Sequence, residues 1–287
     1  MTGPAPLLVV TTRSHLRTPA RFGHMALASA RIRRQLVRDE DVVRWASLVA
    51  GPSEFWTITV WRSRHGMQEF MRSGAHDDIM WLFSRWLDSF WLMRWRPTEH
   101  EVGSWGPSSL AAPPVAARTP VPDDRRELLD RALHHLPRLR AATGADGAAA
   151  FDATTAARRR RAEVADARAL VVRLQVPIRE TVAAVAALRS LRRTAEQRHR
   201  VVRSTLGLGR PGEVYLLTVW GDVTEPASFL GGDDLARIRS RWPQGLWAQV
   251  WVPENEFGNW DGVRLRRGRD RFAIRVPDEA RALDAQP

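Results

Sequence analysis

Short apolar runs alternate with longer amphipathic stretches along the chain, and they follow the same order in both halves. Apolar residues recur at every second position in a half-buried strand and at every third or fourth position in a surface helix. By these criteria the first half contains strand, helix, strand, strand, helix and strand, at residues 7–12, 19–36, 42–49, 55–61, 67–87 and 90–95. The second half repeats that order at residues 170–176, 179–197, 201–206, 214–220, 235–242 and 246–252. We expect Pro97 to end the last strand of the first half, because proline cannot donate a hydrogen bond to a sheet.

The spacing of the tryptophans indicates that the two halves are copies of one unit. Four tryptophans in the first half follow one another at intervals of 5, 4 and 10 residues, and four in the second half at intervals of 5, 4 and 9. Neighbouring residues agree as well, including Asp77 with Asp233 and Glu101 with Glu256. Such matches in one order predict an internal duplication. The matched tryptophans are Trp86, Trp91, Trp95 and Trp105 against Trp242, Trp247, Trp251 and Trp260.

The order of elements in each half is that of the ferredoxin-like β-α-β-β-α-β unit, which makes the fold class α+β. We expect a first unit at residues 1–106 and a second, degenerate copy at residues 167–277. Residues 107–166 are rich in Pro, Ala and Arg and are predicted to be a partly helical linker, with a helix at 124–140. Residues 278–287 are predicted to be a flexible tail. Because each sheet alone would expose a large apolar face, two units paired as a closed α/β-barrel are favoured over two independent domains.

Composition narrows the possible chemistry. The chain has 287 residues and no cysteine, which excludes disulfides, thiolate metal sites, iron–sulfur clusters and a cysteine nucleophile. The net charge is +12, and every lysine-or-arginine position counted in it is an arginine. These arginines are spread along the chain. A phosphate-binding surface usually concentrates its charge on one element. Nucleic-acid binding is therefore disfavoured, and a peripheral contact with an anionic membrane surface or an acidic partner is slightly more favoured.

Several functional classes and locations receive no support from the sequence. It contains no run of 18 apolar residues, and residues 1–10 do not form a secretory signal, so we expect a cytoplasmic protein. It also contains no glycine-rich phosphate loop, no Ser-His-Asp order and no His-Glu-x-x-His motif. Hydrolase and nucleotide-dependent functions are therefore not indicated.

Four segments carry a resemblance to a known family. They are residues 56–61 (WTITVW), 67–70 (MQEF), 73–76 (SGAH) and 258–262 (GNWDG). Together they resemble spheroidene monooxygenase and its relatives, over about 180 residues of the two repeats. The resemblance implies a tandem dimeric α/β-barrel, and it implies haem bound through a histidine with dioxygen as co-substrate. The carotenoid-oxidising members carry that histidine in the second repeat, whereas the histidine of this chain lies in the first.

His76 is the candidate iron ligand. Its neighbours on one helical face are apolar, namely Ile79, Met80, Phe83 and Leu87, so the imidazole should face the space between helix and sheet. A neutral imidazole in an apolar environment suits the axial position of haem iron. A core histidine bonded to a backbone carbonyl is the alternative. The second repeat has Gly232 at the matching position, and because a histidine needed by the fold should appear in both copies, this asymmetry suggests a functional role and leaves both interpretations open.

Several other residues are candidates for the predicted cofactor and substrate site. Met80, Phe83 and Trp56 are predicted to line the cofactor, although a tryptophan such as Trp56 is more often a core residue than part of a cofactor wall. Arg44, if it points inward, is expected to pair with a haem propionate or to polarise oxygen. Trp45 is expected on the substrate side and His24 as a distal group, with a surface position as the alternative for His24. Glu101 and Glu256 are interpreted as structural anchors at turns.

The sequence thus favours a haem-dependent monooxygenase that acts on an apolar organic substrate with dioxygen and an electron donor. Two alternatives stay open: a cofactor-free monooxygenase or lyase on the same scaffold, and a non-catalytic barrel that binds a small molecule or a partner. Either a monomer or a homodimer is compatible, because a tandem unit already satisfies the pairing that single-unit relatives reach by dimerising.

Overall fold

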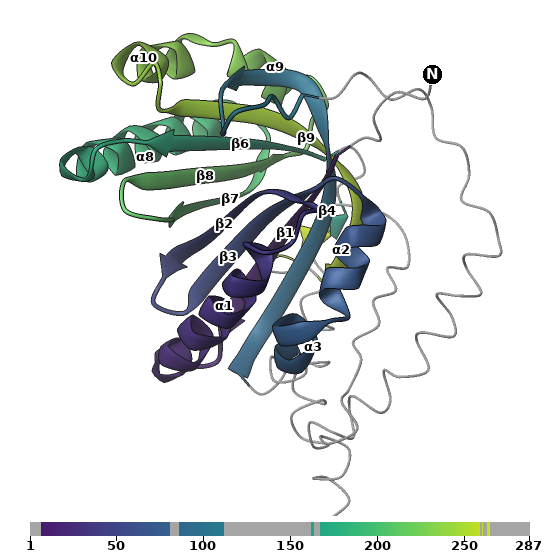
Figure 1. The fold of residues 1–287 in the computed structure, drawn as a ribbon. Helices are drawn as coiled ribbons and strands as arrows, with labels where there is room; N and C mark the ends of the chain where they lie inside the picture. The colour runs from purple at the N-terminus through teal and green to yellow at the C-terminus, as the bar shows by residue number, and fades with distance from the viewer. Residues whose placement is uncertain are drawn as a thin grey trace, which may run out of the picture.

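Eight antiparallel strands form one closed barrel in the computed structural model, which describes residues 7–80, 86–111, 162–163, 167–258, 260 and 263–264 (Figure 1). Neighbouring strands follow the order β1-β3-β2-β7-β8-β6-β9-β4. Each half of this order is a ferredoxin-like sheet, so the predicted fold class is confirmed. The strands are β1 (Leu8–Leu16), β2 (Val42–Gly51), β3 (Glu54–Trp61), β4 (Leu87–Gly103), β6 (Arg168–Gln175), β7 (Val201–Leu208), β8 (Glu213–Trp220) and β9 (Leu246–Gly258).

Helices cover the outside of the barrel. The first unit carries α1 (Phe22–Leu36), α2 (Arg64–Met71) and α3 (Gly74–Met80), and the second carries α8 (Thr181–Arg198), α9 (Glu225–Leu230) and α10 (Asp233–Arg241). The prediction of a single helix at residues 67–87 is wrong, because the helix is interrupted between α2 and α3. Gly74 has a φ of +55°, a left-handed conformation that favours glycine and cannot continue a helix. Helix α9 was not predicted.

The two ends of each sheet are joined very differently. Strands β4 and β9 pair over ten residue positions, from Trp91 opposite Gly258 to Gly103 opposite Trp247. Strands β2 and β7 share one pair, Val49 opposite Leu208. The barrel is therefore tightly joined along one seam and lightly joined along the other.

The predicted end of a strand at Pro97 is wrong, because β4 continues through it to Gly103. Pro97 lies opposite Trp251, and a register shift follows before Glu101. The shift accommodates a residue that cannot donate to the ladder, while pairing with the second unit extends the strand.

The interior of the barrel is filled by aromatic side chains. Twenty buried residues form one apolar cluster there, and seven of them are tryptophans. Their rings lie close together, as with Trp56 and Trp260 at 4.6 Å and Trp105 and Trp247 at 4.9 Å between centroids. Two further clusters lie between the sheets and their helices, one in each unit. The molecule thus has three apolar layers, with the densest aromatic packing in the middle.

A reciprocal exchange of hydrogen bonds ties the two units together. Trp91 of the first unit donates its indole N–H to Glu256 of the second at 2.7 Å. Trp247, the counterpart of Trp91, donates to Glu101, the counterpart of Glu256, at 2.6 Å. The two glutamates therefore anchor the partner unit's tryptophan rather than only a local turn. A buried indole N–H needs such an acceptor, and a carboxylate makes the stronger bond.

A short parallel sheet joins β5 (Ala162–Glu163), inside the predicted linker, to β10 (Val263–Arg264). The helix expected at 124–140 and the tail at 278–287 lie outside the described residues. None of the described helices is long and apolar enough to cross a membrane.

Removal of one exchanged carboxylate should destabilise the barrel. Glu256→Ala leaves the Trp91 N–H without this acceptor in a buried site, and we expect a loss of about 1–3 kcal/mol in the free energy of unfolding. Glu256→Gln keeps an acceptor oxygen and should lose less. Urea unfolding followed by tryptophan fluorescence measures both, with Glu99→Ala on the exposed part of β4 as the control. Equal stability of the Glu256→Ala and Glu99→Ala variants would contradict the assigned role.

Candidate functional site

His76 lies near the start of α3, just beyond the break with α2. Its Nδ1 is 3.1 Å from the backbone oxygen of Met71, the last residue of α2. A carbonyl oxygen only accepts, so Nδ1 carries the proton and Nε2 carries the lone pair. Among the residues that the structure describes, none donates a hydrogen bond to Nε2. The ring therefore has Nδ1 fixed by the backbone, while Nε2 accepts no hydrogen bond from the described part of the chain.

Burial keeps this imidazole neutral. Desolvation between the helices lowers the pKa of His76 to about 4, and the bond to Met71 only partly opposes that shift. The ring lies 5.1 Å from that of Phe70, which in turn lies 5.1 Å from that of Trp61. Phe70 and Trp61 belong to the apolar cluster between the first unit's sheet and its helices. His76 thus borders the layer in which the sequence predicts it.

Gln35, on the last turn of α1, holds the segment that carries His76. Its amide nitrogen donates to the backbone oxygens of Phe70 at 3.3 Å and Ser73 at 2.9 Å. Its amide oxygen accepts from the backbone N–H of His76 at 3.0 Å. One side chain therefore bridges both sides of the break between α2 and α3. Sequence reasoning missed Gln35, and a polar residue beside the buried Leu36 on an otherwise apolar helix face was the available signal.

The other predicted cofactor residues lie in different places. Met80 ends α3, but its side chain, like the whole of Phe83, lies outside the described part of the chain. Trp56 is fully buried inside the barrel, where its indole donates to Glu54 at 2.7 Å and packs against Trp91 and Trp260. The structure therefore does not bring Trp56 into the layer of His76.

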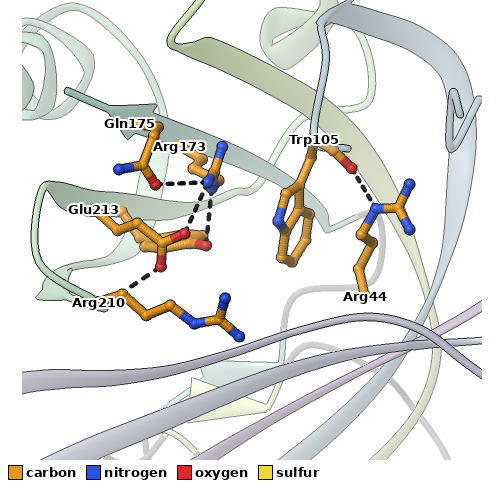
Figure 2. A network of polar contacts seen from close by, with 7 residues as sticks. Arg44, Trp105, Arg173, Gln175, Arg210 and Glu213 are labelled. Atoms are coloured by element: carbon orange, nitrogen blue, oxygen red, sulfur yellow. Dashed lines mark hydrogen bonds and ion pairs between the residues drawn. The ribbon is translucent and has the colours of Figure 1, made fainter. Parts of the chain in front are cut away.

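Arg44 lies at one end of the barrel and binds the chain that follows β4 (Figure 2). Its Nε donates to the backbone oxygen of Trp105, and its Nη2 lies 3.3 Å from the hydroxyl of Ser108. In the second unit, Arg203 donates in the same way to the backbone oxygen of Trp260 at 3.1 Å. The contact recurs in both units, as expected of an arginine that supports the fold.

Trp45 and His24 lie on the outer side of the barrel, apart from each other. Two guanidinium groups lie over the Trp45 ring, that of Arg210 at 4.5 Å and that of Arg33 at 5.6 Å from the ring centroid. His24 is exposed on α1, with its ring 5.8 Å from that of Trp86. Neither has a contact with His76 among the described residues, so a catalytic role for Trp45, Arg44 or His24 stays a prediction.

A buried polar network was also missed. At the end of β6, Arg173 donates to Glu213 at 2.7 Å and to the hydroxyl of Tyr215 at 3.1 Å (Figure 2). Burial raises the pKa of Tyr215 above its usual value. The first unit matches this pair with Arg13 and Glu54 at 3.1 Å. The duplication could have revealed it, because both arginines lie on the first strand of a unit and both glutamates begin the third.

Comparison with known proteins places the fold. No family model matches the sequence, and no curated protein matches it either. A solved aldoxime dehydratase in complex with butyraldoxime is 9% identical, with a TM-score of 0.50, over 90% of this chain and 84% of that one. An anthrone oxidase-like protein is 11% identical, with a TM-score of 0.30, over 94% of this chain and 99% of its own. A candidate monooxygenase from Fusobacterium nucleatum subsp. nucleatum is 6% identical, with a TM-score of 0.33, over 92% of this chain and 99% of its own. The first likeness supports the tandem α/β-barrel fold.

The depressed pKa of His76 predicts a specific dependence of stability on pH. The unfolded chain takes up the proton near pH 6.5 and the folded chain only near pH 4, so acidification through this window favours unfolding. At pH 4.5 the loss from this one group should be roughly 2 kcal/mol. Urea unfolding at pH 7 and pH 4.5 should show that His76→Gln escapes most of this loss. His24→Gln, on an exposed helix face, should behave as the unmodified protein does. A His76→Gln variant that is equally acid-sensitive would contradict the neutral buried imidazole.

Loss of the Gln35 bridge should loosen the start of α3. Gln35→Ala removes the acceptor of the His76 backbone N–H, and hydrogen exchange of that amide should accelerate about tenfold. Exchange read by NMR or mass spectrometry tests this, with Gln197→Ala at the exposed end of α8 as the control. Unchanged protection of the His76 amide would show that Gln35 does not hold this segment.

Proposed function

We propose that the protein is a haem-dependent, monooxygenase-like oxidoreductase that acts on an apolar organic substrate. The observation that carries the proposal is the state of His76, a neutral imidazole whose Nδ1–H is bound to the Met71 carbonyl and whose Nε2 has no donor among the residues that the structure describes. Metal-binding histidines commonly donate their other ring N–H to a carbonyl, which fixes the ring and raises the basicity of the ligating nitrogen. The donor atom therefore fits an iron porphyrin.

The proposal puts the haem on the helix side of the first sheet, not inside the barrel. The barrel interior is occupied by twenty buried side chains, whereas His76 borders the outer layer. Bound haem would supply the oxidative chemistry there. The protein's part is to hold the axial nitrogen through Met71 and Gln35 and to exclude water with the neighbouring apolar side chains. Phe70, Met67 and Trp61 belong to that apolar layer.

The duplication supports a site in one unit only. The position that matches His76 in the second unit is Gly232, which serves as the N-cap residue of α10. The two copies differ at this position although Asp77 and Asp233 are retained beside it, as a site in one unit only would require.

A second candidate is a cofactor-free enzyme that uses the same histidine. It needs no space for a porphyrin beside His76, and the hollow on α10, lined by Asp233, Ala236, Arg237 and Ser240, lies in the second unit instead. A neutral His76 can also accept a proton from a bound substrate without any metal. A barrel that binds a small molecule without turnover is the remaining reading.

Haem incorporation tests the proposal directly. Protein produced with haem supply, or reconstituted with haemin, should show a Soret band, and His76→Ala should abolish or shift it. His65→Ala, on the exposed face of α2, is the matched control and should keep the band. A colourless preparation after reconstitution would refute the haem proposal. Oxygen uptake with a panel of electron-rich aromatic substrates would then separate a cofactor-free enzyme from a non-catalytic barrel.

A further inference from the structure

Most of the large apolar side chains left exposed lie on or next to two helices and the seam between their sheets. Eight are exposed among the described residues, and all but Val223 lie on or directly after α1, on or just before the first turn of α8, or at the facing ends of β2 and β7. Leu27 is 61% exposed on α1, and Val182 is 81% exposed on α8. Exposed apolar residues scattered singly need no explanation, but a concentration of them marks an interaction surface. The seven are Phe22, Leu27, Val37, Val49, Ile178, Val182 and Leu208.

These residues belong to neighbouring elements. Val49 and Leu208 are the one backbone pair that joins β2 to β7. Helix α1 packs beside β2, and α8 packs beside β7 and β8. Figure 1 shows the two helices on either side of the β2–β7 seam. We call this surface the α1–α8 face, made of α1, α8 and the seam between them.

Arginines surround the exposed apolar residues. Helix α1 carries Arg31, Arg33 and Arg34, all exposed, and has no acidic residue. Helix α8 carries four arginines against one glutamate. At the seam, the guanidinium groups of Arg33 and Arg210 lie over the partly buried ring of Trp45. The face therefore combines positive charge, exposed aliphatic groups and an amphipathic aromatic ring.

We propose that the α1–α8 face docks on the anionic surface of a lipid bilayer. Aliphatic side chains that protrude between arginines can enter the boundary between headgroups and acyl chains, while the guanidinium groups stay at the anionic headgroups. Each arginine near such a surface contributes about 1 kcal/mol. The protruding Leu27, Ile178 and Val182 favour a bilayer over a nucleic acid, because phosphate backbones offer nothing for aliphatic groups to enter.

Vesicle co-sedimentation of the full chain tests the proposal. The protein should bind vesicles of phosphatidylcholine with one third phosphatidylglycerol, should bind pure phosphatidylcholine vesicles far less, and should dissociate as salt is raised. Absence of binding to the anionic vesicles, or equal binding to both, would overturn the proposal.

Substitutions that keep the net charge separate insertion from simple charge attraction. The double variant Leu27→Gln/Val182→Gln should bind the anionic vesicles about tenfold more weakly, because it removes two apolar groups from the bilayer boundary. Val223→Gln, an exposed apolar residue outside the face, is the control and should bind as the unmodified protein does. An equal loss in the control, or no loss in the double variant, would contradict docking through this face.

Charge is tested in the same way. Arg34→Gln on α1 should weaken binding about fivefold. Arg239→Gln on α10 removes the same charge elsewhere and should have a smaller effect. A circular dichroism spectrum confirms that each variant is folded. If the protein instead binds duplex DNA through these arginines while the apolar substitutions leave vesicle binding unchanged, the surface serves a nucleic acid and the proposal is wrong.

Discussion

The exchange of indole hydrogen bonds between the two units is the constraint on which the rest of the barrel depends. Trp91 and Trp247 each need an acceptor inside an apolar interior, and each finds it on the opposite unit, at Glu256 and Glu101. Neither unit alone could satisfy its own tryptophan in this way. The exchange fixes the register of β4 against β9, and that register aligns the tryptophans that fill the interior.

Much of this architecture is predictable because the sequence contains the same unit twice. The tryptophan spacing identified two units, and the order of elements in each identified the fold. The errors arose where a contact between units overrides a local signal. Pro97 ends a strand in most contexts, but pairing with β9 carries β4 past it. The break at Gly74 was a local signal that the apolar periodicity of residues 67–87 concealed.

The candidate site was predictable only in part, for a related reason. The position of His76 beside an apolar layer follows from helical periodicity, and its absence from the second unit follows from the repeat. Its hydrogen bonds do not, because Gln35 lies on another helix, 41 residues earlier in the chain. Arg44 was expected near a cofactor on the assumption that it points inward. The structure instead occupies its guanidinium group with backbone at the end of the barrel, a contact that no residue spacing encodes.

Because the two seams are paired so unequally, the barrel should open more easily along one of them than along the other. A ring of eight strands held by one backbone pair between β2 and β7 will part there before it parts anywhere else, with β4 and β9 acting as the hinge. The helices α1 and α8 flank this weakly paired seam. Separation of α1 from α8 would expose the tryptophan-filled interior to water along this line, while the ten-residue pairing of β4 with β9 keeps the two units joined.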